Sequence, residues 1–161
     1  MTTNEINAEI ELKHIELELK YGRTQHFRHF IDQYYCYKHG CVTSGGKAKW
    51  EGLLFTGAVS VAARAAEENR KDLVKEHAIP LKFITCHLLN LIKTNQISTE
   101  NIAKLIDDYF IVGTITKEED RKLRGLNLSS RMPVEYFDPS SWLHGDPLAR
   151  YRIANIALEN P

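Results

Sequence analysis

Apolar residues recur at helical spacing over most of the chain, and the first stretch does so on two faces. Residues 4–20 are rich in Glu, Lys, Leu and Ile, which are mostly good helix formers. On a helical wheel they give one stripe of Ile6, Ile10 and Leu17, and an opposite stripe of Ala8, Leu12, Ile15 and Leu19. A helix that is apolar on two faces packs between two layers or against a partner chain. The alternation at 15–19 also fits a strand; we favour a helix.

The same periodicity predicts further helices, with start and stop signals at most of them. They cover residues 24–38, 48–72, 81–93, 99–108, 117–124 and 147–156. Thr116 and Glu119 form a capping box, and Asp146-Pro147 is a typical helix opening. The stretch 48–72 is rich in Gly and Ala, which favours a tightly packed central helix.

Two short stretches have the pattern of strands instead. Residues 110–116 are apolar and partly β-branched, and residues 74–79 precede a Pro-terminated turn. Residues 126–146 hold two Pro and several Ser and Asp, so we expect ordered irregular structure anchored by Met132, Phe137 and Trp142.

The pattern as a whole predicts a mainly α protein. We expect a single compact domain over 1–161, with about six helices and one small β element near 74–79 and 110–116. Its parts would be an N-terminal helical part (4–72), a central motif region (74–124), and a C-terminal irregular segment and helix (126–157).

Composition narrows the class of protein without naming one. Lys+Arg and Asp+Glu both number 21 in 161 residues, and this balance counts against a dedicated nucleic-acid binder, although a local basic patch remains compatible with it. Three Cys, an odd number, and an acidic N-terminus with no apolar leader indicate a reducing compartment. No apolar run approaches the ~20 residues needed to span a bilayer. We therefore expect a cytoplasmic protein.

The strongest candidate chemistry lies in residues 74–80, VKEHAIP, taken together with residues 111–123. The adjacent Glu76 and His77 offer a carboxylate for a metal ion and an imidazole that can take a proton from water. The pattern EHxxP resembles DHxxP, the first motif of the HNH-type (ββα-metal) nucleases. That resemblance implies that Glu76 assists metal binding and that His77 activates water.

Two later positions of the family motif differ in this chain. The family has an Asn at the second strand–helix junction and a metal-binding His on the helix, whereas here the junction carries Asp120 and residues 117–124 contain no His. Glu119 or Asp120 would then supply a second carboxylate for a divalent ion, Mg or Zn. The competing interpretation is structural, with His77 at a helix end before a helix that Pro80 begins.

A second metal hypothesis concerns the Cys and His residues. Zinc takes both as ligands, and Cys36, His39 and Cys41 lie close in sequence, with Cys86-His87 further on. The usual paired spacing of two Cys is missing, and buried free Cys is common. We favour unliganded Cys.

Residues 20–49 hold six cations against the single acid Asp32, with aromatic residues between them. Cations bind phosphates and exposed rings stack on bases. The candidate nucleic-acid ligands are Arg23, Arg28, Lys47 and Lys49, joined by Arg150, which suits bidentate phosphate binding. Alternatively, the basic residues are the polar face of a core helix, and Arg150 pairs with a surface acid.

Two functional hypotheses follow from these observations. The first is a small metal-dependent HNH-like nuclease that hydrolyses phosphodiesters, with His77 as base and Glu76, Glu119 and Asp120 around a divalent cation. The second is a non-enzymatic helical regulator or inhibitor that binds a protein or nucleic acid through residues 1–49, or self-associates through its N-terminal helix. The two differ in whether the side chains of Glu76, His77, Glu119 and Asp120 converge.

Overall fold

The computed structural model describes residues 1–159, which form seven α-helices, three short 3₁₀ helices and a three-stranded sheet. The mainly α class and the small β element are as predicted. The helices are α1 (Thr3–Lys20), α2 (Phe27–Lys38), α3 (Val61–Ala65), α4 (Leu81–Lys93), α5 (Thr99–Tyr109), α6 (Lys117–Gly125) and α7 (Ala149–Ile153). The strands are β1 (Ala58–Val59), β2 (Leu73–His77) and β3 (Val112–Thr116). Within the described residues, no helix combines the length and the apolar character that crossing a membrane requires.

The chain divides into two compact units, each built from two separate stretches. Unit 1 comprises Met1–Leu53 and Ile84–Tyr109, and unit 2 comprises Leu54–Phe83 and the chain from Phe110 onward. The three boundaries fall after Leu53, inside α4, and between α5 and β3.

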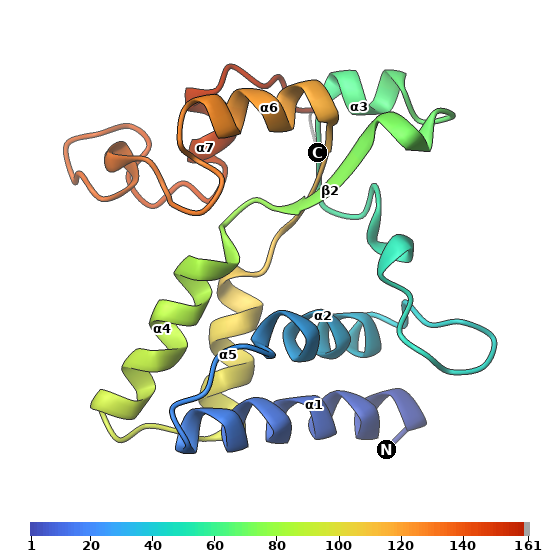
Figure 1. The fold of residues 1–161 in the computed structure, drawn as a ribbon, viewed down its shortest axis with the longest axis vertical. Coiled ribbons are helices and arrows are strands. Elements are labelled where there is room, and N and C mark those ends of the chain that lie inside the picture. Colours follow the sequence, from blue (N-terminus) through green and yellow to red (C-terminus); the bar gives the residue numbers. More distant parts are fainter. Residues whose placement is uncertain (160–161) are drawn as a thin grey trace. The chain divides into compact units, whose positions relative to one another are not determined.

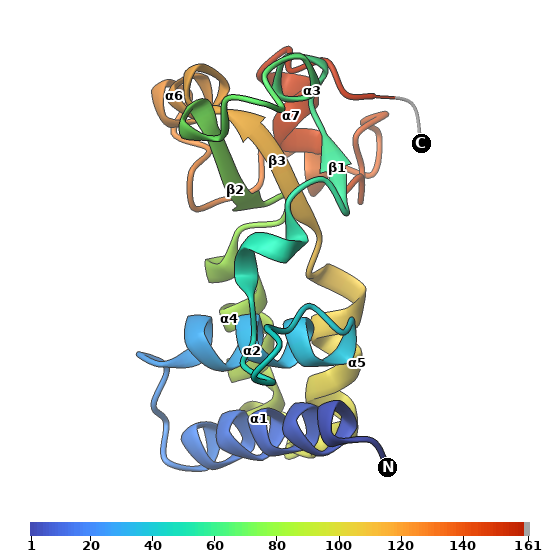
Figure 2. The ribbon, with the colours of Figure 1, turned by 90° about the vertical axis from the view of Figure 1, so that its right-hand side faces the viewer.

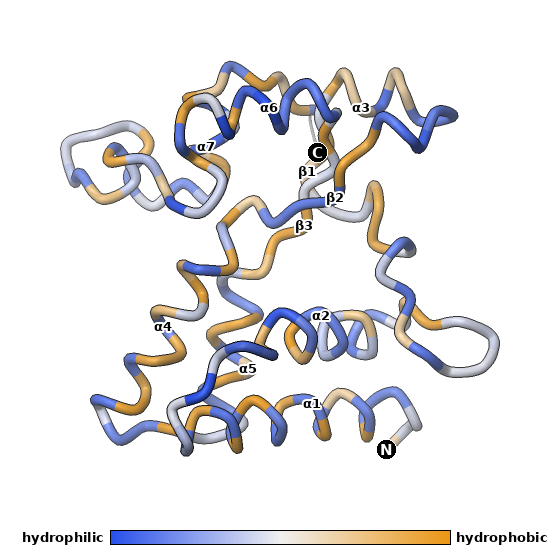
Figure 3. The backbone as a smooth tube through the Cα atoms, in the orientation of Figure 1, coloured by the Kyte–Doolittle hydropathy of each residue, from blue (hydrophilic) through white to orange (hydrophobic). Residues whose placement is uncertain are grey.

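Unit 1 is helical, with α1 packed alongside α2 and α5 (Figure 1). Thr2 and Glu5 form a capping box that begins α1, and α2 begins at Phe27, later than predicted. Only one of the two predicted stripes of α1 is buried, the one formed by Ala8, Leu12, Ile15 and Leu19. The opposite stripe is exposed, and Figure 3 shows the resulting mixture of hydrophobic and hydrophilic positions along α1.

Unit 2 is organised around the sheet, whose strand order is β1–β3–β2 (Figure 2). β1 runs parallel to β3, and β2 runs antiparallel to it, with Glu76 opposite Gly113. The sheet, α6 and α7 enclose a core of Ala78, Ile115, Leu123, Leu128, Tyr151, Ala154 and Ile156. The capping box of Thr116 and Glu119 begins α6 as predicted.

The prediction of one long helix over residues 48–72 is wrong. This stretch contains a 3₁₀ helix at Trp50–Leu53, then β1, α3 and a second 3₁₀ turn at Arg70–Asp72. Ser60 has extended backbone and its hydroxyl accepts from the N–H of Ala63, so a helix begins only after it. A Cβ added at Gly57 would lie 2.1 Å from the carbonyl oxygen of Val112. The small residue therefore permits close approach to a strand, not helix packing.

The last helix and two predicted anchors also differ from expectation. α7 begins at Ala149, because Asp146 accepts from the N–H of Leu148 (2.9 Å) in a turn before the helix, and α7 ends at Ile153. Met132 is buried as predicted, whereas Phe137 and Trp142 are exposed and touch Phe83 and Arg152, respectively, from the surface.

Candidate functional site

Glu76, the predicted metal ligand and catalytic-site residue, lies in a buried network in unit 2. Its Oε2 is 3.1 Å from Nη1 of Arg150, and its Oε1 accepts a hydrogen bond from the hydroxyl of Tyr151. Gly113, opposite Glu76 on β3, makes room for this contact, because a Cβ there would lie 1.9 Å from the Tyr151 oxygen. Both carboxylate oxygens therefore already have protein partners.

Arg150 was predicted to bind phosphate, and its position contradicts that role. The side chain is only 1% exposed. Besides Glu76, it donates to three backbone carbonyl oxygens: Leu128 (2.7 Å), His77 (2.7 Å) and Ala78 (3.1 Å). The guanidinium thus ties α7 to the end of β2 and to the chain after α6, out of reach of a ligand in solvent.

Burial controls the protonation of this network. It raises the pKa of Glu76, while the positive charge of Arg150 and the hydrogen bond from Tyr151 act in the opposite direction. Burial also raises the pKa of Tyr151 well above its ordinary value, and the negative charge of Glu76 adds to that effect. Tyr151 consequently stays a hydrogen-bond donor to Glu76 at neutral pH.

His77, the predicted general base, ends β2 and is buried. Its ring meets that of Phe110 edge to face, with the centroids 4.9 Å apart. The alternative of a helix end at His77 is wrong, because the residue pairs with Val112 in the sheet and the helix begins at Leu81. The imidazole lies in aromatic packing rather than at an open surface.

The two other predicted carboxylate ligands have structural partners. Glu119 Oε2 accepts from the Ser60 hydroxyl (2.6 Å) and from the N–H of Thr116 (2.8 Å). Asp120 forms an ion pair with Arg124, 2.6 Å away and one turn along α6. Across residues 1–159, no group of three or more His, Cys, Asp or Glu side chains is placed to hold a metal ion. The predicted ligands are thus not brought together as a metal site.

The Cys and His residues of the zinc hypothesis lie in unit 1. Cys36 is buried in α2, Cys41 is partly exposed, and Cys86 is exposed; all three are free thiols. The ring of His39 packs on Tyr35, and that of His87 stacks on Tyr109 with centroids 5.0 Å apart. Within residues 1–159, these Cys and His side chains belong to no group of three that could hold a metal ion.

The basic segment 20–49 is partly neutralised. Its ion pairs join Lys20 to Glu16 (2.6 Å), Arg23 to Glu18 (3.2 Å) and Lys38 to Asp107 (2.5 Å). Arg28 and Lys49 are exposed, as is Lys47, and none of the three has an ion pair within residues 1–159. Of the five predicted nucleic-acid ligands, three remain open for phosphate binding.

The exposed stripe of α1 is the clearest apolar surface of unit 1 that is not covered by packing within the unit. Ile6 is 45% exposed, Ile10 42% and Leu17 54%. Their spacing of four and seven residues aligns them on one face, with Lys13 between them. The sequence pattern had identified this stripe but could not tell which of the two would pack inside the unit.

The network around Glu76 contains residues that the sequence did not point to. Tyr151 and Gly113 carried no motif, and the contact joins residues 75 apart in the chain. No family model matches this chain, and comparisons with curated proteins and with solved structures found no match.

Proposed function

We propose that this protein is a non-enzymatic helical module that binds a protein partner through residues 1–49, with α1 as the docking surface. The observation that carries the proposal is the outward stripe of Ile6, Ile10 and Leu17, each at least 42% exposed. The stripe runs from Ile6 to Leu17, about 16 Å along α1, so it can accompany a partner helix over about three turns.

Burial of this stripe would contribute a moderate affinity. Covering the exposed part of each aliphatic side chain is worth about 1 kcal/mol, roughly half of full burial. Three such side chains together favour binding by about a hundredfold over a polar stripe. The partner must therefore add further contacts, as expected for a helix lying along α1.

The two Lys of α1 are paired within the chain, and its Glu residues outnumber them. Lys13 pairs with Glu9 (2.6 Å) and Lys20 with Glu16 (2.6 Å), while His14 lies 3.1 Å from Glu11. The rim is acidic, since α1 carries five Glu against two Lys, and it suits a partner helix with basic flanks. It suits a polyanion less well, which weighs against nucleic acid as the partner of α1.

The test replaces Ile6, Ile10 and Leu17 together by Ser. Analytical ultracentrifugation from micromolar to millimolar protein detects a second copy as partner, and capture from cell extract with a stoichiometric readout detects another protein. The matched control removes three exposed apolar side chains from unit 2: Leu126, Val134 and Phe137. We expect association to be lost only in the α1 variant. Association that is unchanged by the α1 substitutions would overturn the proposal.

Nucleic-acid binding through the same segment stays a separate prediction. Arg28, Lys47 and Lys49 would carry it, and affinity would fall steeply with salt because phosphate contacts release counterions. Changing these three residues to Gln should abolish binding of an oligonucleotide; salt-insensitive binding would exclude this mode.

A metal-dependent nuclease is the second candidate. It is supported by the order of β2, β3 and α6 in unit 2, with His77 at the end of β2. The expected result is plasmid nicking with Mg²⁺, Mn²⁺ or Zn²⁺, stopped by EDTA and abolished by His77→Ala with unchanged circular dichroism. A positioned base contributes typically about 10²–10⁴-fold. Protein that cuts neither DNA nor RNA with any of these ions removes this candidate.

A further inference from the structure

The chain after α7 returns to the sheet of unit 2 and adds to its edge. The N–H of Val61 donates to the carbonyl of Ala157 (2.9 Å), and the N–H of Glu159 donates to the carbonyl of Val59 (2.9 Å). Between these two bonds, Ser60 and Leu158 form an antiparallel bridge. Residues 157–159 thus lie beside β1 as an outer strand.

This register leaves one residue of the outer strand with a free backbone. Ser60 and Leu158 are a non-hydrogen-bonded pair, so the N–H and C=O of Leu158 point away from β1. Across residues 1–159, neither group of Leu158 has a hydrogen-bond partner. An unpaired strand edge is a template on which another extended chain can pair.

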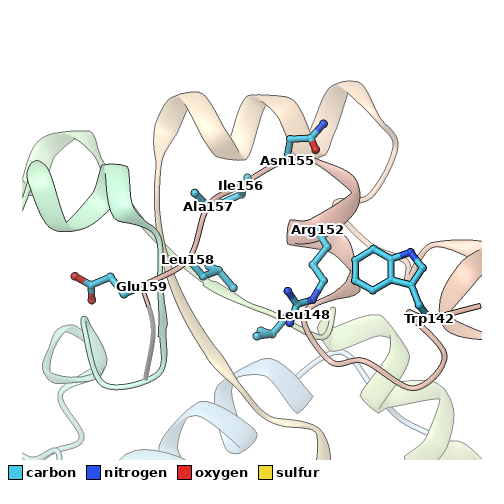
Figure 4. A pocket seen from close by; sticks show the side chains of 8 residues that line it. All are labelled: Trp142, Leu148, Arg152, Asn155, Ile156, Ala157, Leu158 and Glu159. Carbon is cyan, nitrogen blue, oxygen red and sulfur yellow. The ribbon is translucent and has the colours of Figure 1, made fainter.

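A pocket of about 600 Å³ lies beside this edge, and Trp142, Arg152, Leu158 and Glu159 are among the residues that line it. Figure 4 shows Trp142 and Arg152 next to each other on one side of the outer strand. Trp142 is 78% exposed, and the guanidinium carbon of Arg152 lies 5.9 Å from its ring centroid. Asp146 holds Arg152 through Nε, which fixes the guanidinium beside the ring.

We propose that this edge and pocket form a docking site for an extended peptide segment of another protein. The segment pairs its backbone with Leu158 and lays an apolar side chain on Trp142. Arg152 donates from its terminal nitrogens to a carbonyl or carboxylate of the segment. Trp and Arg are the residue types that most often dominate such contacts.

An extended peptide fits these groups better than other occupants. An extended chain can hydrogen-bond to both the free N–H and the free C=O of one residue, whereas the backbone groups of a helix are already used within the helix. The charges nearby are already balanced, since Glu159 accepts from Arg64 (2.9 and 3.1 Å) and Asp146 accepts from Arg152. The site therefore does not require a highly charged ligand. Its size is within the range of about 300–1,000 Å³ typical of ligand pockets.

The experiment uses the full chain with Trp50→Phe, which makes Trp142 the single tryptophan reporter. The probe is the blocked pentapeptide acetyl-Thr-Val-Phe-Val-Thr-amide, with two versions N-methylated at Phe or at the following Val. We expect the parent peptide to shift the emission of Trp142 and to protect the Leu158 amide from hydrogen exchange. Because alternate N–H groups of a strand face its partner, only one of the two methylated peptides should bind.

Two substitutions at one position separate backbone pairing from simple contact. Leu158→Pro removes the free N–H without touching the bonds to β1, and Leu158→Ala keeps it as the matched control. We expect the Pro variant to bind the peptide at least about tenfold more weakly than the Ala variant, and Trp142→Ala to weaken binding by a similar factor.

Four results would overturn the proposal. Two concern selectivity: the Leu158→Pro and Leu158→Ala variants bind the peptide with equal affinity, or both methylated peptides bind equally well. The other two are that no peptide binds at millimolar concentration, and that the protein without peptide forms a dimer which Leu158→Pro dissociates. The last result would assign the edge to a second copy of this chain. The site lies in unit 2, so rejecting this proposal would leave the proposed role of α1 unaffected.

Discussion

Replacing Arg150 by Met tests whether the Glu76–Arg150 network stabilises unit 2. The substitution keeps most of the side-chain volume but leaves the carboxylate of Glu76 buried without its cation. It also removes the donor to the carbonyl oxygens of Leu128, His77 and Ala78. Breaking a buried ion pair on one side costs about 3–5 kcal/mol, and a side chain that is 1% exposed places Arg150 in this class.

The assay is urea denaturation followed by circular dichroism, with hydrogen exchange of the β2 and β3 amides as a readout confined to unit 2. We expect the free energy of unfolding of unit 2 to fall by about 4 kcal/mol, a large share of the 5–15 kcal/mol typical of a domain. Arg152→Met is the control from the same helix. Arg152 is 44% exposed and pairs with Asp146, so its loss should cost at most about 1 kcal/mol.

If Arg150→Met and Arg152→Met lowered the free energy of unfolding by similar amounts, the reasoning would be contradicted, because burial would then not distinguish the two ion pairs. A loss below 1 kcal/mol for Arg150→Met would mean that water solvates Glu76 in the variant. In that case the network would not hold β2 and α7 together.

Three further predictions concern unit 2. Thr116→Ala should lower the free energy of unfolding by about 1 kcal/mol through loss of the N-cap bond to Glu119, measured as a denaturation midpoint that falls with unchanged slope. Gly113→Ala should destabilise unit 2 more strongly, since its Cβ would meet the Tyr151 oxygen at 1.9 Å, and unchanged thermal stability would refute that contact. Folding raises the pKa of Tyr151, so above pH 10 the unfolded chain loses this proton while the folded chain keeps it. The free energy of unfolding should therefore be full below pH 10 and fall as the pH rises beyond it. Tyr151→Phe should flatten this decline, measured by denaturation at pH 10–12.

Elements with local signals were predictable from the sequence. α4 has the predicted bounds, Leu81–Lys93, because Pro80 precedes an amphipathic run of the right length. The capping box at Thr116 set the start of α6 in the same way. These signals lie within a few residues of the helix end, so no distant contact is needed to interpret them.

Elements that depend on distant contacts were not predictable. In residues 48–72 the Gly and Ala residues have helical spacing, yet Gly57 serves a close approach to Val112, which lies more than fifty residues away. Likewise, Arg150 was expected to face solvent, and nothing near it in sequence indicates that Glu76 would meet it in the interior. Such pairs become visible only when the sheet and α7 are assembled.

The distance in sequence between Glu76 and Arg150 also affects how unit 2 forms during synthesis. The two residues are 74 positions apart, so at about 5–20 residues per second Arg150 follows Glu76 by about 4–15 s. Unit 1 is complete in sequence at Tyr109, whereas β2 then still lacks β3 and its cation. A nascent chain therefore carries the first stretch of unit 2 unpaired for seconds, with an exposed strand and an uncompensated carboxylate. During that interval this stretch is a natural target for chaperones that hold unfolded segments.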